Sequence, residues 1–427
     1  MADVIEGRPR PAAPLTPLLA DAMPSWDALH DRYGALLKLV DNVLGVVPNC
    51  DRYLEIWPPA FRTYNVMVPN LLNLPAPVLG VGGAPADVVG LAMYVASRTA
   101  QCPYCSAHSC SFAMRRGAPP EKVTAALLPD RIGFTRGELA AIAAARSLAR
   151  VPCELTVAER DELRDAFGDE HAEWIVLAIA MMGFLNKFMD AIGVELEQSV
   201  VSEVLSTIGP DWAAGKAGAQ LDPEVPTHAP PPSDGLRTRL RMIPLLPAVI
   251  RYDRRAQRGM PKRWPAVGRF LRDTCGHDFP VLAHLRSNRA RRAIASMLVA
   301  NLDSQSTIVG IDVKVHAGAV FAAVVGSVDL ADDVRALARS HGIDAQQLDD
   351  TMRFARGDDG ALPDHSQTAP TLLLARAAAS SPATIDAATI AACQDARLTP
   401  PAIVEVVTWL AVLQLLHRLT CYVRLSE

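Results

Sequence analysis

Aromatic residues are scarce in this sequence, at 5% of 427 residues, and neither sign of charge is in excess, since the formal net charge is −4. Abundant alanine with few aromatics favours closely packed helices over sheets. A nearly balanced charge gives no general reason to expect nucleic-acid binding. The eight cysteines include no second pair with metal-ligand spacing, so a structural zinc site is not expected.

Signals for secretion and for membrane insertion are also lacking. Met1 to Pro24 contains acids and prolines, but no basic start followed by an apolar stretch. The longest uninterrupted apolar run, Trp174 to Leu185, has twelve residues, which is too short to span a bilayer. We therefore expect a protein of the reducing cytoplasm with no membrane partner.

The pattern of apolar residues is helical nearly throughout. Glu138 to Arg150 has the spacing of an amphipathic helix, and Thr156 with Glu159 forms a capping-box signature before another helix. Sustained alternation of polar and apolar residues, bracketed by turn residues, does not occur. The sequence predicts an all-α fold.

One segment interrupts this pattern, because it is rich in proline and glycine and poor in apolar residues. We predict an N-terminal tail (1–24), a first helical domain (25–209), a linker (210–236) and a second helical domain (237–427). The second domain repeats the first at three separated places, with offsets of about 225 to 231 residues. The matched segments are Arg116-Gly117 with His341-Gly342, Ala145-Arg146 with Ala375-Arg376, and Asn186-Lys187-Phe188 with His417-Arg418-Leu419.

The most informative motif is Cys102-Pro-Tyr-Cys105, followed by Ser106-Ala107-His108-Ser109. Both thiols fall in the opening turn of a predicted helix, where free backbone N–H groups favour a thiolate and lower a thiol pKa. Their spacing puts them on one helical face, so the pair can cycle between dithiol and disulfide. The corresponding positions of the second domain, Ser327 and Leu330, carry no thiol.

Residues 25–208 resemble the AhpD-like, carboxymuconolactone decarboxylase superfamily of all-helical proteins. Its redox members carry a Glu, eleven residues, Cys-x-x-Cys, three residues and a His. The flanking segments that share the resemblance are Ala96-Ser97-Arg98, Arg115-Arg116-Gly117-Ala118, Asn186 to Asp190 and Gly193 to Glu197. The family pattern implies that Cys105 attacks the substrate and that Cys102 resolves the product.

Two positions depart from that pattern, because Gly90 stands where the family has its Glu and Ser109 where it has its His. His108 is displaced by one position, about 100° around a helix, and still lies three residues after Cys105. Asp87, about one turn before Gly90, is the candidate replacement for the carboxylate. We expect His108 and Asp87 to form an altered proton relay.

The resemblance implies a thiol-dependent oxidoreductase of the alkylhydroperoxidase type, which reduces a peroxide and is restored by an external dithiol. It implies no haem, flavin or metal cofactor, and assembly as a homo-oligomer. Two other classes stay open. One is a lyase or isomerase acting on a lactone or similar metabolite, which the lost Glu favours and the cysteine pair opposes. The other is a non-enzymatic helical scaffold with vestigial thiols.

Overall fold

The computed structural model describes residues 14–74, 76, 83–129, 131–209, 235, 240–362 and 368–424. Every regular element in these ranges is helical and none is a strand, which confirms the predicted all-α fold. The predicted linker, 210–236, lies outside the described residues except for Gly235. We call residues 14–209 the N-terminal half and residues 240–424 the C-terminal half.

The N-terminal half contains ten α-helices within its described residues, three of which are shorter than seven residues. They are α1 (Thr16–Leu19), α2 (Trp26–Leu44), α3 (Cys50–Glu55), α4 (Pro58–Leu71), α6 (Ala86–Thr99), α7 (Pro103–Arg115), α8 (Pro120–Ala125), α9 (Arg136–Ala149), α10 (Val157–Ile192) and α11 (Gln198–Ile208). The expected capping box of Thr156 and Glu159 is present at the start of α10.

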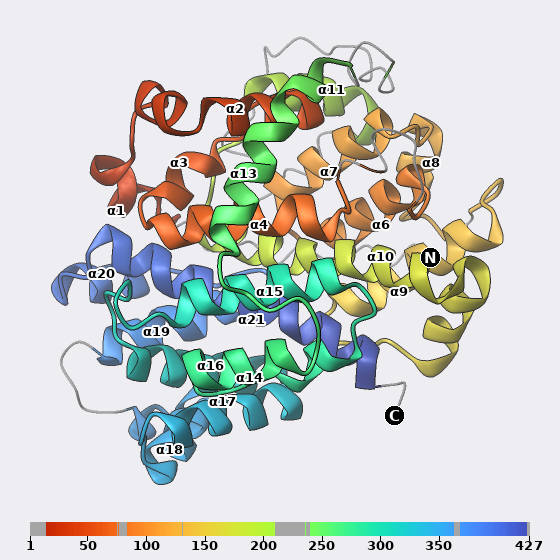
Figure 1. The fold of residues 1–427 in the computed structure, drawn as a ribbon. Helices are drawn as coiled ribbons and strands as arrows, with labels where there is room; N and C mark the ends of the chain where they lie inside the picture. The colour runs from red at the N-terminus through yellow and green to blue at the C-terminus, as the bar shows by residue number, and fades with distance from the viewer. Residues whose placement is uncertain are drawn as a thin grey trace.

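The described part of the C-terminal half also consists of helices joined by short connections. They are α13 (Leu246–Ala256), α14 (Ala266–Cys275), α15 (Asn288–Leu302), α16 (Ile311–Val325), α17 (Val328–Ser340), α18 (Ala345–Ala355), α19 (Thr368–Ala379), α20 (Ala387–Asp395) and α21 (Pro400–Arg424). Figure 1 shows most of these helices below those of the N-terminal half, while α13 lies above, beside α2 and across α4.

The long helices α10 and α21 pack against each other at the centre of the molecule (Figure 1). Gly183 permits this approach, because a Cβ atom there would lie 3.1 Å from the carbonyl oxygen of Gln414 and 3.0 Å from Arg418 Cδ. Both helices are long and apolar enough to cross a membrane, but 94% and 100% of their most apolar windows are buried inside the protein. Burial of that extent is the pattern of core helices.

At the predicted offset of 225 residues, two successive helices begin at equivalent positions in the two halves. Helices α6 and α7 match α16 and α17, and in each case a side chain caps the second helix. Cys102 Sγ accepts a hydrogen bond from the Cys105 N–H at 3.4 Å, and Ser327 Oγ accepts one from the Leu330 N–H at 3.4 Å. This likeness is what a duplication predicts; division into two separately folding domains stays a prediction.

The end of the predicted N-terminal tail packs on the core instead of extending into solvent. Leu15 and Leu19 are fully buried, and the Leu15 N–H donates to the carbonyl oxygen of Ile192 at 3.1 Å. Residues 1–13 lie outside the described residues. The described part of the predicted tail therefore packs against the N-terminal half.

Candidate functional site

The two motif cysteines lie where the sequence places them, at the start of α7. Cys102 is its N-cap, with an extended backbone, and Cys105 lies in the first turn. Both are free thiols and both are buried, Cys102 completely and Cys105 with 3% of its surface exposed. The structure thus contains a dithiol pair, with no disulfide between the two residues.

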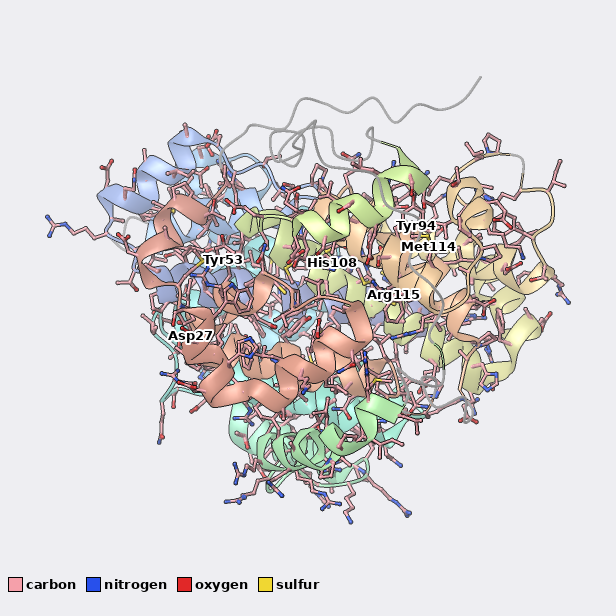
Figure 2. The ribbon with its side chains drawn as sticks, turned by 90° about the horizontal axis from the view of Figure 1, so that it is seen from above. Asp27, Tyr53, Tyr94, His108, Met114 and Arg115 are labelled. Carbon is pink, nitrogen blue, oxygen red and sulfur yellow. The ribbon has the colours of Figure 1, made fainter. Side chains whose placement is uncertain are left out.

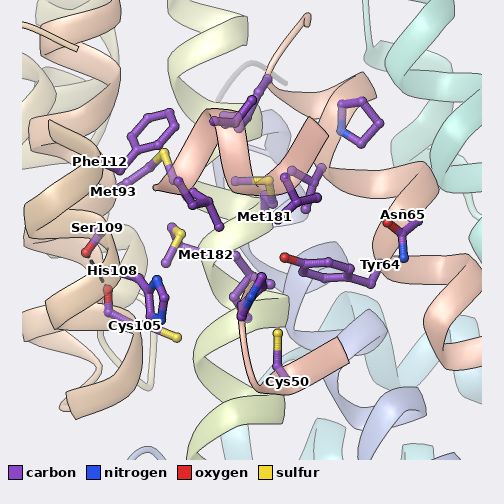
Figure 3. Close-up of a pocket in the computed structure, with 18 of the residues that line it drawn as sticks. Cys50, Tyr64, Asn65, Met93, Cys105, His108, Ser109, Phe112, Met181 and Met182 are labelled. Atoms are coloured by element: carbon purple, nitrogen blue, oxygen red, sulfur yellow. Dashed lines mark hydrogen bonds between the residues drawn. The ribbon is translucent and has the colours of Figure 1, made fainter. Parts of the chain in front are cut away.

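Cys105 faces an apolar cavity of about 90 Å³. Figure 3 shows this cavity between α7 and α4, with the methionines of α10 behind it. Cys105, His108, Ser109 and Phe112 line one side; on the other lie Tyr64 and Asn65, and Cys50 lies below. Seen from above, His108 lies near the centre of the molecule and Asp27 at its periphery (Figure 2). The cavity is suited to a small apolar molecule.

Glu197, just before α11, is the polar centre of the site. Its Oε2 lies 2.7 Å from His108 Nε2, and its Oε1 accepts a hydrogen bond from Tyr104 Oη at 2.9 Å and another from the Asn49 N–H. Although burial favours its protonated form, the charge and hydrogen bond of His108, together with the N–H of Asn49, lower the pKa of Glu197. A buried carboxylate therefore holds the His108 ring in place.

The expected lowering of the Cys105 pKa by the helix N-terminus is wrong. Burial raises the pKa of this thiol well above its usual value, and the hydrogen bond and charge of Cys102 raise it further. The backbone N–H of Cys105 donates a hydrogen bond to the Cys102 sulfur, so this N–H group of the helix start contacts Cys102. Burial therefore outweighs any stabilisation of the Cys105 thiolate by the helix start.

A buried cation lies near Cys102. The Lys187 ammonium donates to the carbonyl oxygen of Ala379 at 2.8 Å and to Ser381 Oγ at 3.0 Å, both in the segment after α19. Burial lowers the pKa of Lys187 to about 7, and the negative charges of Asp190 and a Cys102 thiolate oppose this shift. The C-terminal half thus supplies hydrogen-bond acceptors for this buried amine.

Cys50 and Asp51 at the start of α3 add two groups that the sequence motif did not indicate. Cys50 lines the cavity and is hydrogen-bonded to Tyr104 and Tyr64, and burial raises its pKa well above the usual value. Burial, followed by the charges of Glu197 and Glu55, raises the pKa of Asp51 to about 8. Neither Asp51 oxygen has a hydrogen-bond partner, so this carboxyl is a buried group that gains a proton near neutral pH.

The structure does not bring Asp87 to the other predicted site residues. Asp87 lies in the first turn of α6 and is absent from the cavity lining, and the carboxylate beside His108 is Glu197. Gly90 marks a close contact of α6 with α7, because a Cβ atom there would lie 2.6 Å from Ala113 Cα. Ser109 lines the cavity and donates to the Cys105 carbonyl oxygen at 2.5 Å.

The sequence predicted a site of Cys102, Cys105 and His108. In the structure Cys105 and His108 both line the cavity, and Cys102 contacts Cys105 through the Cys105 N–H. The predicted site did not include Glu197, although the segment ending in Glu197 was part of the family resemblance. A signal for Cys50 and Tyr64 was not available, since neither lies in a motif and both reach the cavity from helices before α6. Val249 of α13 also lines the cavity, so the C-terminal half contributes to its wall.

No protein-family model matches this chain, and no curated protein matches it. Among solved structures, the chain is similar to the debrominase Bmp8 in its apo form, with 22% identity, a TM-score of 0.36, and coverage of 42% of this chain and 94% of that chain. A cysteine-to-alanine variant of Bmp8 in complex with 2,3,4-tribromopyrrole gives 21% identity, 43% and 96% coverage, and the same TM-score of 0.36. A TM-score this low does not establish a shared fold.

Proposed function

We propose that this protein is a thiol-dependent oxidoreductase of the AhpD-like type, which reduces an organic hydroperoxide through a Cys102/Cys105 dithiol–disulfide cycle. The observation that carries this proposal is the position of Cys105 in the wall of the cavity, three residues from a histidine held by a buried carboxylate. Cys102, capping the same helix turn, is fully buried behind it. An attacking thiol facing the substrate and a resolving thiol behind it are the two parts this chemistry needs.

Because its pKa is raised, the Cys105 thiol is protonated at rest, and His108 acts as the base that removes its proton. His108 Nε2 is engaged by Glu197, which leaves Nδ1 as the nitrogen that accepts the Cys105 thiol proton. The nearby carboxylate stabilises the imidazolium that forms. This arrangement allows a thiol that is protonated at rest to ionise when substrate is bound.

The chemical steps then follow with two electrons per turnover. The Cys105 thiolate attacks the terminal peroxide oxygen, an S–O bond forms as the O–O bond breaks, and the alcohol leaves with the proton from His108. The Cys102 sulfur attacks the resulting sulfenic acid, so that an S–S bond forms and water leaves. An external dithiol reduces the disulfide by exchange. This cycle requires no haem, flavin or metal.

The lining of the cavity supports an apolar substrate. Apart from Cys105, His108 and a few other polar groups, its wall is formed by leucine, valine, methionine, proline and phenylalanine side chains. Such a wall contributes hydrophobic binding energy to an alkyl or aryl hydroperoxide and none to hydrogen peroxide. We expect kcat/KM to be higher for the organic peroxide.

The test is a steady-state assay with cumene hydroperoxide as substrate and dithiothreitol as reductant. Cys105→Ser should abolish turnover, and in the absence of dithiothreitol Cys102→Ser should undergo one round of oxidation that ends in a trappable sulfenic acid. Cys275→Ser, which alters a buried thiol of α14, is the control and should retain activity. Unchanged turnover in Cys105→Ser would overturn the proposal.

A further inference from the structure

A second pair of thiols lies outside the cavity, at the contact between the two halves. Cys153 is in the segment between α9 and α10, and Cys421 is near the end of α21. Their side chains are hydrogen-bonded to each other, and both residues are partly exposed. Cys421 Sγ also lies 3.8 Å from each ring nitrogen of His417, one turn earlier on α21.

The surroundings of this pair favour a thiolate on Cys153. The hydrogen bond from Cys421 lowers the pKa of Cys153, and burial opposes this effect. The Leu155 N–H and the Arg418 guanidinium lower the pKa further. The same hydrogen bond raises the pKa of Cys421, which keeps its proton. Burial lowers the pKa of His417 to about 4, so this ring is neutral at pH 7.

These features distinguish the pair from buried structural cysteines. Burial raises the pKa of Cys275 and of Cys393, whereas the Cys153 pKa is lowered and its side chain reaches the surface. A metal site does not explain the cluster, because no group of three His, Cys, Asp or Glu side chains in the described part of the chain is placed to hold a metal ion.

The predicted repeat gives a second contact between the halves that is equivalent to the Cys153–Cys421 contact but has different side chains. With the offset of 231 residues, Arg418 matches Lys187 and Cys421 matches Asp190. Asp190 Oδ2 accepts a hydrogen bond from the Ala383 N–H at 2.7 Å, where Cys421 instead meets the thiol of Cys153. Of these two contacts between the halves, one therefore joins a carboxylate to a backbone N–H, and the other joins two thiols.

We propose that Cys153 and Cys421 are a second redox-active dithiol, which a hydroperoxide oxidises to a disulfide that links α21 to the segment between α9 and α10. The Cys153 thiolate attacks a peroxide oxygen, the O–O bond breaks, and water or an alcohol leaves with one proton. Cys421 then attacks the sulfenic acid at Cys153, the S–S bond forms, and water leaves. An external dithiol reverses the oxidation. Negative charge on Cys153, on Cys105 or on Cys421 raises the pKa of Arg418, so this guanidinium interacts electrostatically with both thiol pairs.

The test uses the full-length Cys102→Ser/Cys105→Ser variant, so that its outcome does not depend on the proposed peroxidase activity. The reduced protein is treated with about one equivalent of hydrogen peroxide at pH 7, alkylated and digested. Mass spectrometry should find peptides joined through Cys153 and Cys421, while Cys275 and Cys393 carry the alkyl label. Recovery of Cys153 and Cys421 as alkylated thiols would overturn the proposal.

Single substitutions in the same background assign the two roles. With Cys421→Ser, a dimedone adduct should accumulate on Cys153, because the resolving thiol is absent. With Cys153→Ser, Cys421 should stay reduced, since its raised pKa makes it a poor nucleophile. Equal dimedone labelling of Cys421 in that variant would contradict the assignment of Cys153 as the attacking thiol.

Discussion

His108 Nε2 lies 2.7 Å from the Glu197 carboxylate, and this contact joins α7 to the segment that precedes α11. The carboxylate also accepts a hydrogen bond from Tyr104, one turn earlier on α7. Three side chains thus form a partly buried polar network near the Cys105 thiol, at the edge of an otherwise apolar cavity. A network of this kind fixes the orientation and tautomer of a histidine that acts as a base.

Glu197→Gln should slow peroxide reduction by about 10²-fold or more, since the imidazolium of His108 loses its counter-charge. Glu203→Gln is a matched control, because Glu203 also joins α11 to α7, through Ser111 at 2.7 Å and Arg115, without contact to His108. Steady-state rates with cumene hydroperoxide measure the difference. Equal loss of rate in the two variants would show that only the packing of α11 matters.

Asp51 should make stability fall as the pH rises. Its pKa is raised from 3.8 to about 8, so the folded protein holds this proton more tightly than the unfolded chain, and stability is lost from about pH 4 to about pH 8. Asp51→Asn should raise the free energy of unfolding at about pH 8.5 by an amount on the order of a few kcal/mol, and by clearly less at about pH 5. Urea unfolding at both pH values measures this; an equal change at both would count against the raised pKa.

The C-terminal half should depend strongly on a buried ion pair. Lys314 Nζ lies 2.5 Å from Glu405 Oε1, and both side chains are almost fully buried. Glu405→Ala should lower the free energy of unfolding by about 3–5 kcal/mol, because it leaves a buried ammonium without its partner. Asp350→Ala, which removes a surface pair with Arg353, is the control and should change stability little. Similar losses for the two variants would contradict the account.

Gly90 should not tolerate a side chain. Gly90→Ala places a Cβ atom 2.6 Å from Ala113 Cα, so α6 and α7 must separate at the level of the cysteine motif, with a clear loss of thermal stability. Gly34→Ala in α2 meets no atom within 4 Å and should be neutral or slightly stabilising. If Gly90→Ala melts at the wild-type temperature, the contact of α6 with α7 is looser than the structure shows.

The sequence was sufficient to predict the helical class and the thiol pair at a helix start, because both depend on local patterns. It was not sufficient to predict the environment of that pair. The pKa of Cys105 depends on burial by helices far away in the chain, and the partner of His108 comes from 89 residues downstream. Asp87 was predicted as the carboxylate from helix spacing alone. Helix spacing contains no information on a contact between residues 89 positions apart, such as that of His108 with Glu197.

Lys314 and His316 show the same limit in the C-terminal half. In the sequence they are isolated polar residues in an apolar run, without visible partners. In the structure Lys314 pairs with Glu405 from α21, and His316 Nδ1 lies 2.8 Å from Thr351 Oγ1 of α18. Buried polar side chains need such partners, but which residues supply them depends on how helices pack.

The most direct test of the proposed peroxidase is oxidation of the reduced wild-type protein with about one equivalent of cumene hydroperoxide. Peptide mapping by mass spectrometry after alkylation then reports the state of each cysteine. The account predicts a Cys102–Cys105 disulfide, formed with release of one equivalent of alcohol. Unconsumed hydroperoxide, with Cys102 and Cys105 both recovered as alkylated free thiols, would contradict it.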